Sequence, residues 1–493
     1  MLSSSAFKPL EGTSEAQADL ATAKSSVWGL WAVVALGAVL RLIAIGHRSF
    51  WLDEIASVVI AGLPPRVFWS ALWHNEGNMA LYYVLLRPWL HFGTNETSVG
   101  LLSVVPGVLS IPMTYLLGRH LFGEKSARLA TVFFAINACA VMSSQEARGY
   151  SLLVLGVIVS TYCFVRLVEE PSYALALGYG VAAGLTFYCH YFGLLVPAAH
   201  AVSLVALPAN KRPWTQLVMA AAVAGVFAAP VLEMIRIQDV GHLAWVPRPS
   251  WLELYHLGAY LAAGSGKSIG AVLLVVELVL IALFLRRFAI RWQTREPSPR
   301  FWRNAVVVSC LLTPFALVLL ASLARPVFHH RFLIVCLPAW VLMTAAAVEE
   351  IRSRNWRLGT IAAICVLSLA SVVMAYMRVQ EDWRGVVQYL MAEASPPDRI
   401  LYYQSGGYFA AENYRNWIPG GAAKRPVGII VDPHNSGWEA QLNGAPRIWL
   451  VLYRAKSDDP AVRVIDKELG GEFAMERQKA FRAVTVIEYR NTR

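Results

Sequence analysis

The sequence predicts an all-α polytopic membrane protein with a small α/β domain at its C-terminus. Of the 493 residues, 57% are hydrophobic and only 15% are charged, and the mean hydropathy is +0.48. These values are typical of a chain that crosses a membrane many times. Apolar runs of about 20 residues, the length that crosses a bilayer, recur up to Met377, and more polar sequence follows.

The apolar runs predict about eleven transmembrane helices in a domain that covers residues 27–379. Residues 1–26 are polar and have no basic n-region, so we expect a disordered cytoplasmic tail and no cleaved signal peptide. The helices are expected at 27–45, 99–118, 129–144, 151–168, 173–189, 192–208, 215–234, 269–285, 304–324, 332–348 and 358–377.

Two connections between these helices are long. Residues 46–98 form the first one, with amphipathic pieces at 55–73 and 79–92 that we expect to lie along the membrane surface. Residues 236–267 form a second, polar connection. The remaining connections are short, and several of them are basic.

The basic connections predict the orientation. They all fall on one side of the membrane if residues 46–98 lie outside, which the positive-inside rule favours. The N-terminus is then cytoplasmic, and the C-terminal domain is extracytoplasmic, on the outer face of a bacterial inner (plasma) membrane. The basic connections are 119–128, 211–212, 286–303 and 352–357.

The last part of the chain, residues 380–493, predicts the small outer α/β domain. Its hydropathy falls and its apolar residues alternate between helical and strand spacing. A helix is expected at 383–394, and strands are expected at 399–404, 427–431, 447–453 and 484–489.

Charge and cysteine content exclude other classes. The net charge of +11 comes from basic residues in short connections between apolar runs, so nucleic acid is not an expected partner. The six cysteines show no CxxC or Cys/His spacing, so neither a disulfide framework nor a zinc site is indicated. The sequence specifies no cofactor, and a divalent cation is left open.

Two adjacent carboxylates at the exit of the first helix are the candidate catalytic residues. Asp53 and Glu54 follow Trp51, at a membrane boundary where charges are costly to place. A partly desolvated carboxylate there can accept a proton, so Asp53 is the candidate general base and Glu54 its supporting group. The alternative is that the pair merely ends the helix among the lipid headgroups.

Other unusual polar residues fall at the same predicted face, as an outer-leaflet active site requires. Arg148 and Arg331 are the candidates for binding phosphate, because guanidinium bonds phosphate oxygens bidentately. The alternative for both is an arginine that reaches toward lipid headgroups. The candidate binding residues are Glu76, Asn78, Tyr82, Gln145, Glu146, Arg148, Tyr150, His190, Tyr191, Lys267, His330 and Arg331.

Three features are less informative. The stretch 264–268 resembles the end of a P-loop, but Leu261 replaces its first glycine, so only a lipid-phosphate contact by Lys267 is retained. His329 and His330 indicate a polar cluster at a helix end more than a metal site. Glu277 lies in the middle of a predicted span and is left without a role.

Four stretches resemble the polyprenyl-phosphate-dependent glycosyltransferases of the C-class, and in particular the protein O-mannosyltransferase and aminoarabinose transferase family. The resemblance implies inverting transfer of a sugar from a polyprenyl-phosphate donor, with Asp53 as base and Glu54 supporting it or helping to bind donor or metal. The stretches are Phe50-Trp51-Leu52-Asp53-Glu54, Gly77-Asn78-Met79-Ala80-Leu81-Tyr82-Tyr83, Ser144-Gln145-Glu146-Ala147-Arg148-Gly149-Tyr150 and His330-Arg331-Phe332-Leu333.

The chain also departs from this family. Aminoarabinose transferases carry Glu-Lys-Pro in the first outer loop, whereas this chain has Glu76-Gly77-Asn78 and no lysine. Phosphate binding then depends on other cations, chiefly Arg148 and Arg331. The resemblance leaves the acceptor open as a lipid, an envelope glycan or a protein, with membrane lipids as further partners.

Two other classes remain as alternatives. A lipid or solute transporter (a flippase) would bind near the bilayer midplane, where Glu277 lies, and would show inverted repeats, which the sequence lacks. A non-catalytic scaffold of envelope assembly would use the C-terminal domain for docking, but it would leave Asp53 and Glu54 without a purpose.

Overall fold

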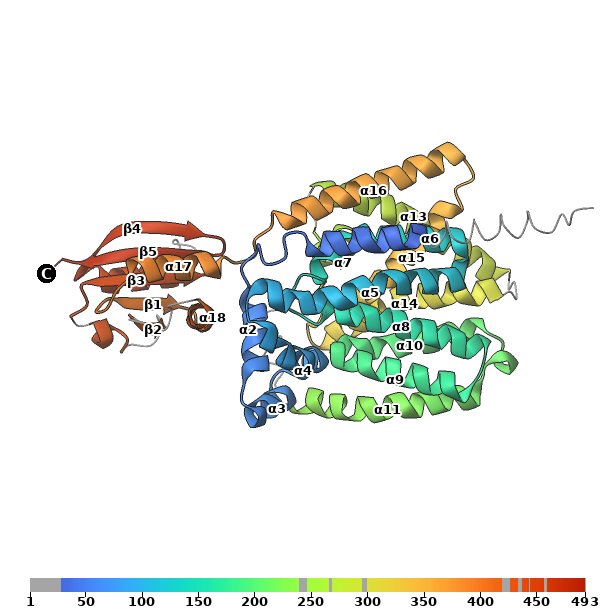
Figure 1. Cartoon of the computed structure of the whole chain (residues 1–493), viewed down its shortest axis with the longest axis horizontal. Coiled ribbons are helices and arrows are strands. Elements are labelled where there is room, and N and C mark those ends of the chain that lie inside the picture. Colours follow the sequence, from blue (N-terminus) through green and yellow to red (C-terminus); the bar gives the residue numbers. More distant parts are fainter. Residues whose placement is uncertain are drawn as a thin grey trace, which may run out of the picture.

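The structure is a computed structural model. It describes residues 28–238, 246–265, 268–294, 299–418, 426–432, 437–442, 444–455 and 459–492. The expectation for residues 1–26 lies outside these ranges. The sheet domain lies at one end of a long helical bundle. α2 lies along that end of the bundle, next to the sheet domain (Figure 1). The expected fold class, a polytopic helical domain with a small C-terminal α/β domain, is confirmed.

Seven described segments are long and apolar enough to span a membrane. Mean hydropathies of 1.7 to 2.8 over these windows make burial in lipid favourable, so the protein is a multi-pass membrane protein. The helices are α5 (Glu96–Phe122), α8 (Tyr150–Glu169), α11 (Trp214–Ile237), α13 (Ser268–Gln293), α14 (Pro299–Ala324), η7 with α15 (Phe332–Cys336, Leu337–Glu349) and α16 (Arg354–Tyr376).

Three shorter apolar helices and one broken helix account for the other expected spans. The short ones are Trp28–Leu42, α9 (Tyr173–Cys189) and the run Tyr191–Ala206, which comprises η3 (Tyr191–Leu194), α10 (Leu195–Ser203) and η4 (Leu204–Ala206). The expected helix at 129–144 is divided at Asn137 into α6 (Glu124–Ile136) and α7 (Ala138–Ser143). The total of eleven spans therefore stays a prediction.

Asn137 explains the break. Its backbone is extended, and its side chain accepts a hydrogen bond from Ala140 N, which caps α7. Its amide nitrogen donates to the carbonyl oxygens of Leu261 and Ala262, at 2.9 and 3.1 Å. The residue thus ends one helix, begins the next and fixes both to a third.

The third helix, α12 (Trp251–Ala263), was not expected, because its sequence lies in the polar connection 236–267. Ser250 caps its start by accepting from Glu253 N. Gly264 ends it with a φ of +68°, a conformation that favours glycine. The glycine that resembled part of a P-loop is therefore a helix C-cap.

The first long connection contains short helices, as expected. They are α2 (Leu52–Gly62), α3 (Pro65–His74), η1 (Gly77–Met79), α4 (Ala80–Trp89) and η2 (Leu90–Phe92). Arg87 of α4 donates to the carbonyl oxygens of Ala61 and Leu63, at 3.0 and 2.6 Å. These bonds satisfy the C-terminal end of α2 and hold the connection compact.

The C-terminal domain has a five-stranded sheet with the order β2-β1-β3-β5-β4. β1, β2 and β3 are parallel, and β5 is antiparallel to both β3 and β4. The elements are α17 (Trp383–Glu393), β1 (Arg399–Tyr403), α18 (Ser405–Trp417), β2 (Val427–Val431), η8 (Glu439–Leu442), β3 (Arg447–Tyr453), α19 (Pro460–Leu469), β4 (Phe473–Phe481) and β5 (Val484–Asn491).

The two faces of this sheet have different neighbours. Tyr402 and Trp449 lie on the face that joins α17, α18 and the core of the membrane domain. Leu401 and Leu450, which are the neighbours of Tyr402 in β1 and of Trp449 in β3, point to the other face and belong to a separate core with α19. The period-two pattern of the strands therefore makes a three-layer domain whose one face is continuous with the bundle.

Ion pairs join helices at the end of the bundle far from the sheet. At the end far from the sheet, Glu169 of α8 lies 2.6 Å from His120 and 2.7 Å from Arg303. Arg287 pairs with Glu350 between α13 and the end of α15. α16 runs from this end to the junction (Figure 1).

Candidate active site

The N-terminus of α2 directs two adjacent carboxylates to different places. Glu54 is buried and accepts from Trp51 N at 3.1 Å and from Ala147 N at 2.8 Å. Burial, and then repulsion from Glu146, raises the pKa of Glu54 to about 7. Glu54 therefore caps α2 and fixes the loop before α8, whereas its neighbour Asp53 is partly exposed.

The Asp53 carboxylate makes no hydrogen bond or ion pair within the part of the chain that the structure describes. Its backbone oxygen accepts from Arg148 Nη1 at 3.4 Å. The side chain nevertheless lies close enough to Arg148 and Arg331 to act on both electrostatically. A carboxylate near two guanidinium groups is thus available for a substrate proton.

Arg148 is held by neutral oxygens. Nη1 donates to Tyr83 Oη at 3.1 Å and to Ser57 Oγ at 3.3 Å, and Nε is buried without a hydrogen-bond partner among the described residues. Tyr82, the candidate from the sequence, accepts a hydrogen bond from Ser103 Oγ at 3.3 Å instead. Tyr83 is therefore the tyrosine that contacts Arg148, and sequence reasoning did not identify it.

Arg331 is the second arginine whose charge interacts with that of Asp53. Its guanidinium is 4.7 Å from the centre of the Trp51 ring, a cation–π contact. Nη2 donates to Gln380 Oε1 at 3.3 Å, and Nη1 lies 3.9 Å from Glu146 Oε2. Nη1 is also buried without a hydrogen-bond partner among the described residues. The Arg331 guanidinium thus retains an N–H donor that can bind an anion.

His190 organises a further wall of the site, where its ring lies 5.3 Å from that of Phe332. Its Nε2 lies 3.3 Å from the Asn78 amide nitrogen, and its ring stacks on Tyr150 with centroids 6.1 Å apart. Asn78 Oδ1 accepts from Tyr191 N at 3.2 Å. Burial, aided by Arg148, lowers the pKa of His190 to about 3, so the ring is neutral at pH 7. Three separate segments meet at this histidine.

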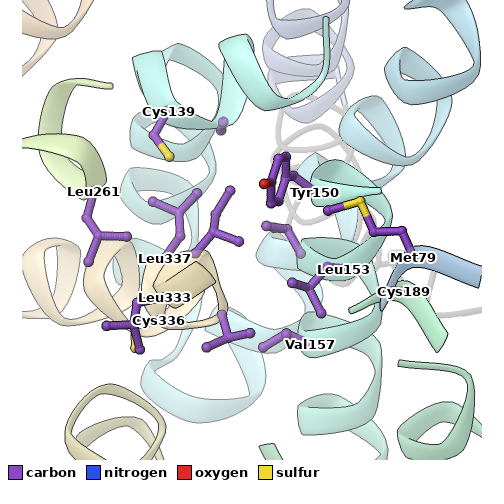
Figure 2. Packing of buried hydrophobic residues seen from close by; sticks show 14 of the residues in the cluster. Met79, Cys139, Tyr150, Leu153, Val157, Cys189, Leu261, Leu333, Cys336 and Leu337 are labelled. Carbon is purple, nitrogen blue, oxygen red and sulfur yellow. The ribbon is translucent and has the colours of Figure 1, made fainter. Parts of the chain in front are cut away.

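Packed apolar side chains lie beside this wall. Figure 2 shows Tyr150 near Met79, with Leu153 and Val157 following along α8. Gly149 N lies 3.3 Å from Met79 Sδ, and all four side chains are fully or almost fully buried. This packing fixes the loop that carries Arg148.

The remaining candidates have other positions. Gln145 donates to the carbonyl oxygens of Arg41 and Ile43, at 3.1 and 2.7 Å, and so holds the end of the first helix. Glu76 precedes η1. Lys267 lies outside the described residues. Among those that are described, no three His, Cys, Asp or Glu side chains converge as a metal site would require.

A cavity of about 490 Å³ opens beside Arg331. Glu146 and His330 also line it, as do two arginines that sequence reasoning missed, Arg378 and Arg482. The pKa of His330 falls to about 3 through burial and the neighbouring cations. The lining residues are Met142, Glu146, His256, Tyr260, Gly264, Ser265, His330, Arg331, Arg378, Val379, Gln380 and Arg482.

Comparison with known proteins finds a family model and a relative that are similar to parts of this chain. Residues 83–233 match the family model described as dolichyl-phosphate-mannose-protein mannosyltransferase. The lipid A galacturonosyltransferase RgtD of Rhizobium johnstonii is 23% identical over 207 residues, which are 41% of this chain and 40% of RgtD. The match thus spans less than half of that relative.

Solved structures of ArnT from Cupriavidus metallidurans share the fold. The apo structure gives a TM-score of 0.60 at 12% identity and covers 94% of this chain and 98% of ArnT. The structure bound to undecaprenyl phosphate gives 0.58 at 12% identity and covers 92% and 97%.

The helical bundle, the long connection 46–98 and the C-terminal sheet domain thus share the fold of ArnT. The family model matches residues 83–233, and both this match and the shared fold agree with the resemblance that the four motifs carry.

Proposed function

We propose that the protein transfers a sugar from a polyprenyl-phosphate donor to a hydroxyl group, with Asp53 as general base. The observation that carries this proposal is the partly exposed Asp53 carboxylate, which is near enough to Arg148 and Arg331 to interact with both charges and has no described side-chain partner. A base must be free to take a proton, and a leaving phosphate needs cations nearby. Both requirements meet at this point.

In the proposed reaction, Asp53 takes the proton of the acceptor hydroxyl as its oxygen attacks the anomeric carbon. The bond between that carbon and the phosphate oxygen breaks, and polyprenyl phosphate leaves with the bonding electrons. Attack from the face opposite the leaving group inverts the anomeric configuration. The proton stays on Asp53 until product release returns it to water.

Arg331 and Arg148 would stabilise the charge that develops on the departing phosphate. Each has a buried guanidinium nitrogen without a hydrogen-bond partner among the described residues, Nη1 in Arg331 and Nε in Arg148. Charge-assisted bonds to phosphate are stronger than bonds between neutral groups. Glu54 supports this arrangement by fixing α2 to the loop that carries Arg148.

The donor's isoprenoid tail would lie in an apolar cavity of about 340 Å³ on the same end of the bundle. Trp69 and Trp73 of α3 line it together with Tyr188 of α9 and Met234 of α11. Burial of apolar chain there would supply binding energy that positions the sugar. The remaining lining residues are Leu72, Ala80, Leu81, Val84, Leu185, Phe227 and Pro230.

We propose that the site faces the outer side of a bacterial inner membrane. The C-terminal domain and the site share one end of the bundle, and the basic connections support a cytoplasmic position for the other end. The acceptor is a hydroxyl of a lipid, an envelope glycan or a protein.

The transporter alternative lacks support from the structure. Glu277, the midspan carboxyl that suggested it, accepts a hydrogen bond from Trp340 Nε1 at 2.6 Å. It therefore joins α13 to α15. Two other buried polar residues of the bundle are bonded elsewhere: Arg41 bonds Ser144, and His200 lies between Thr161 and Tyr179.

The test is single-turnover release of polyprenyl phosphate from a panel of lipid-linked sugars in membranes. Wild type should release it with one donor, and Asp53→Asn should lower the rate by about 100-fold or more, the usual range for general-base catalysis. Glu468→Gln, an exposed change on α19, is the matched control and should keep the wild-type rate. Release that is equal in Asp53→Asn and wild type would overturn the assignment of the base.

A further inference from the structure

The cavity beside Arg331 is built by both domains. Its walls come from α12, from the segment before η7 and from the residues that follow α16. Its outermost side comes from Arg482, in the turn that joins β4 to β5. A site with residues from both domains is complete only when the C-terminal domain is docked on the bundle.

The position of Arg482 is fixed through its backbone. Its carbonyl oxygen accepts from Asp382 N at 3.1 Å, directly before α17. Asp382 in turn caps α17 by accepting from Gly385 N at 3.0 Å. The hairpin turn is therefore attached to the segment that leaves the membrane, and its exposed side chain reaches the cavity.

Arg378 lies between Arg482 and Arg331. It directly follows the last turn of α16 and is half-buried. Burial lowers the pKa of Arg378, and the charges of Arg331 and Arg482 lower it further. The Arg378 guanidinium is thus near enough to both of the others to be repelled by them, which is costly unless an anion lies close by.

The charges of the cavity are unbalanced. Among the described residues that line it, Glu146 is the one carboxylate, against three arginines. Glu146 already faces Arg331 Nη1 at 3.9 Å and accepts from Gln380 Nε2 at 3.4 Å. Two positive charges remain without a carboxylate, which matches the charge that a phosphate monoester carries near pH 7.

We propose that this cavity binds a phosphate group of a substrate and that the C-terminal domain supplies one of its three guanidinium groups through Arg482. The inference rests on the proposed function, because the phosphate belongs to either the polyprenyl donor or the acceptor. The donor phosphate becomes a monoester when it leaves, and a phosphorylated acceptor would carry the same group.

The test measures equilibrium binding of three lipids to the full chain in phosphatidylcholine nanodiscs. The lipids are undecaprenyl phosphate, undecaprenol and phosphatidic acid. Arg482→Ala should weaken the binding of a phosphate lipid about threefold to tenfold, the effect of losing one exposed charge contact. Arg482→Lys should recover most of it, and undecaprenol should bind equally to all variants.

Each outcome has one meaning. A loss for undecaprenyl phosphate identifies the prenyl lipid as the source of the phosphate, and a loss confined to phosphatidic acid indicates a phosphorylated acceptor. Arg463→Ala, an exposed change on α19, is the matched control and should alter neither. Unchanged binding of both phosphate lipids, or an equal loss for undecaprenol, would overturn the proposal.

The binding test is separate from the test of the proposed function. Asp53→Asn should lower transfer about 100-fold or more and keep the Arg482-dependent binding. If wild type transfers no sugar and this binding is present, the proposed function fails and the anion site stands.

Discussion

Replacing Glu381 by alanine should loosen the contact between the C-terminal domain and the helix that carries Asp53. The Glu381 side chain is 2% exposed. Its Oε2 accepts from Leu52 N at 2.9 Å and from Trp383 Nε1 at 2.8 Å. Leu52 is the first residue of α2, so a carboxylate from the C-terminal domain satisfies the start of this helix.

The cost follows from the groups that would lose their partner. Alanine leaves the part-buried N–H of Leu52 and the buried indole N–H of Trp383 without an acceptor, at roughly 1–3 kcal/mol each. Glutamine can place its amide oxygen at the Oε2 position and keep both bonds. The bonds at Oε1, from Tyr453 and the exposed Arg454, are then altered at a cost of about 1 kcal/mol or less.

We therefore expect Glu381→Ala to lower the free energy of unfolding by roughly 2–6 kcal/mol and Glu381→Gln by about 1 kcal/mol. Transfer should fall about 10- to 100-fold in Glu381→Ala, because a shift of about 1 Å in a catalytic group has that effect. The donor KM should change little. The measurements are denaturant unfolding and steady-state transfer in nanodiscs.

Glu393→Ala is the matched control on the same domain. Glu393 is 40% exposed as a side chain and pairs with Arg477 at the surface. We expect this variant to lose about 1 kcal/mol or less and to keep its transfer rate. A wild-type transfer rate in Glu381→Ala would refute the idea that the C-terminal domain positions α2 through Glu381. Equal losses of stability in Glu381→Ala and Glu381→Gln would show that the charge of Glu381 matters more than its hydrogen bonds to the start of α2.

Three further predictions concern single residues. Because the pKa of Glu54 is raised to about 7, the folded state holds the proton more tightly, and the free energy of unfolding should fall by up to roughly 3 kcal/mol between pH 4.5 and 7. Glu54→Gln should remove that slope in denaturant titrations. Arg148→Lys should lower single-turnover transfer about 10- to 100-fold, because lysine lacks the planar donors that reach Tyr83 and phosphate. Its thermal stability should be nearly unchanged. A wild-type transfer rate would contradict this role of Arg148. The free energy of unfolding of Glu277→Gln should stay within about 1 kcal/mol of wild type, because glutamine can still accept a hydrogen bond from Trp340. Glu277→Leu should lose about 1–3 kcal/mol of this free energy. Equal stabilities of the two variants would contradict a role for the hydrogen bond to Trp340.

Hydropathy predicted the membrane helices well, because burial in lipid selects long apolar runs. It failed where a polar side chain decides the backbone. Asn137 divides an apolar run, and no hydropathy window detects the carbonyl groups of Leu261 and Ala262 that it bonds. α12 was missed for the opposite reason, since Glu253 and His256 make its sequence read as a connection.

The candidate site was predictable in part. The motifs identified the loops that meet at the junction, but adjacent residues of a helix point about 100° apart, since a turn has about 3.6 residues. Asp53 and Glu54 therefore serve different neighbours, and Tyr83 reaches Arg148 whereas Tyr82 bonds Ser103. Only the packed structure separates the members of such pairs.

Arg378 and Arg482 had no local signal. Arg378 follows a membrane helix, where an arginine is common, and Arg482 stands in a hairpin turn of a separate domain. Their proximity depends on the register of β4 and β5 and on the docking of the domain through Asp382. Glu381, next to Asp382, bonds the start of α2, so one short segment places both the candidate base and the outer cation.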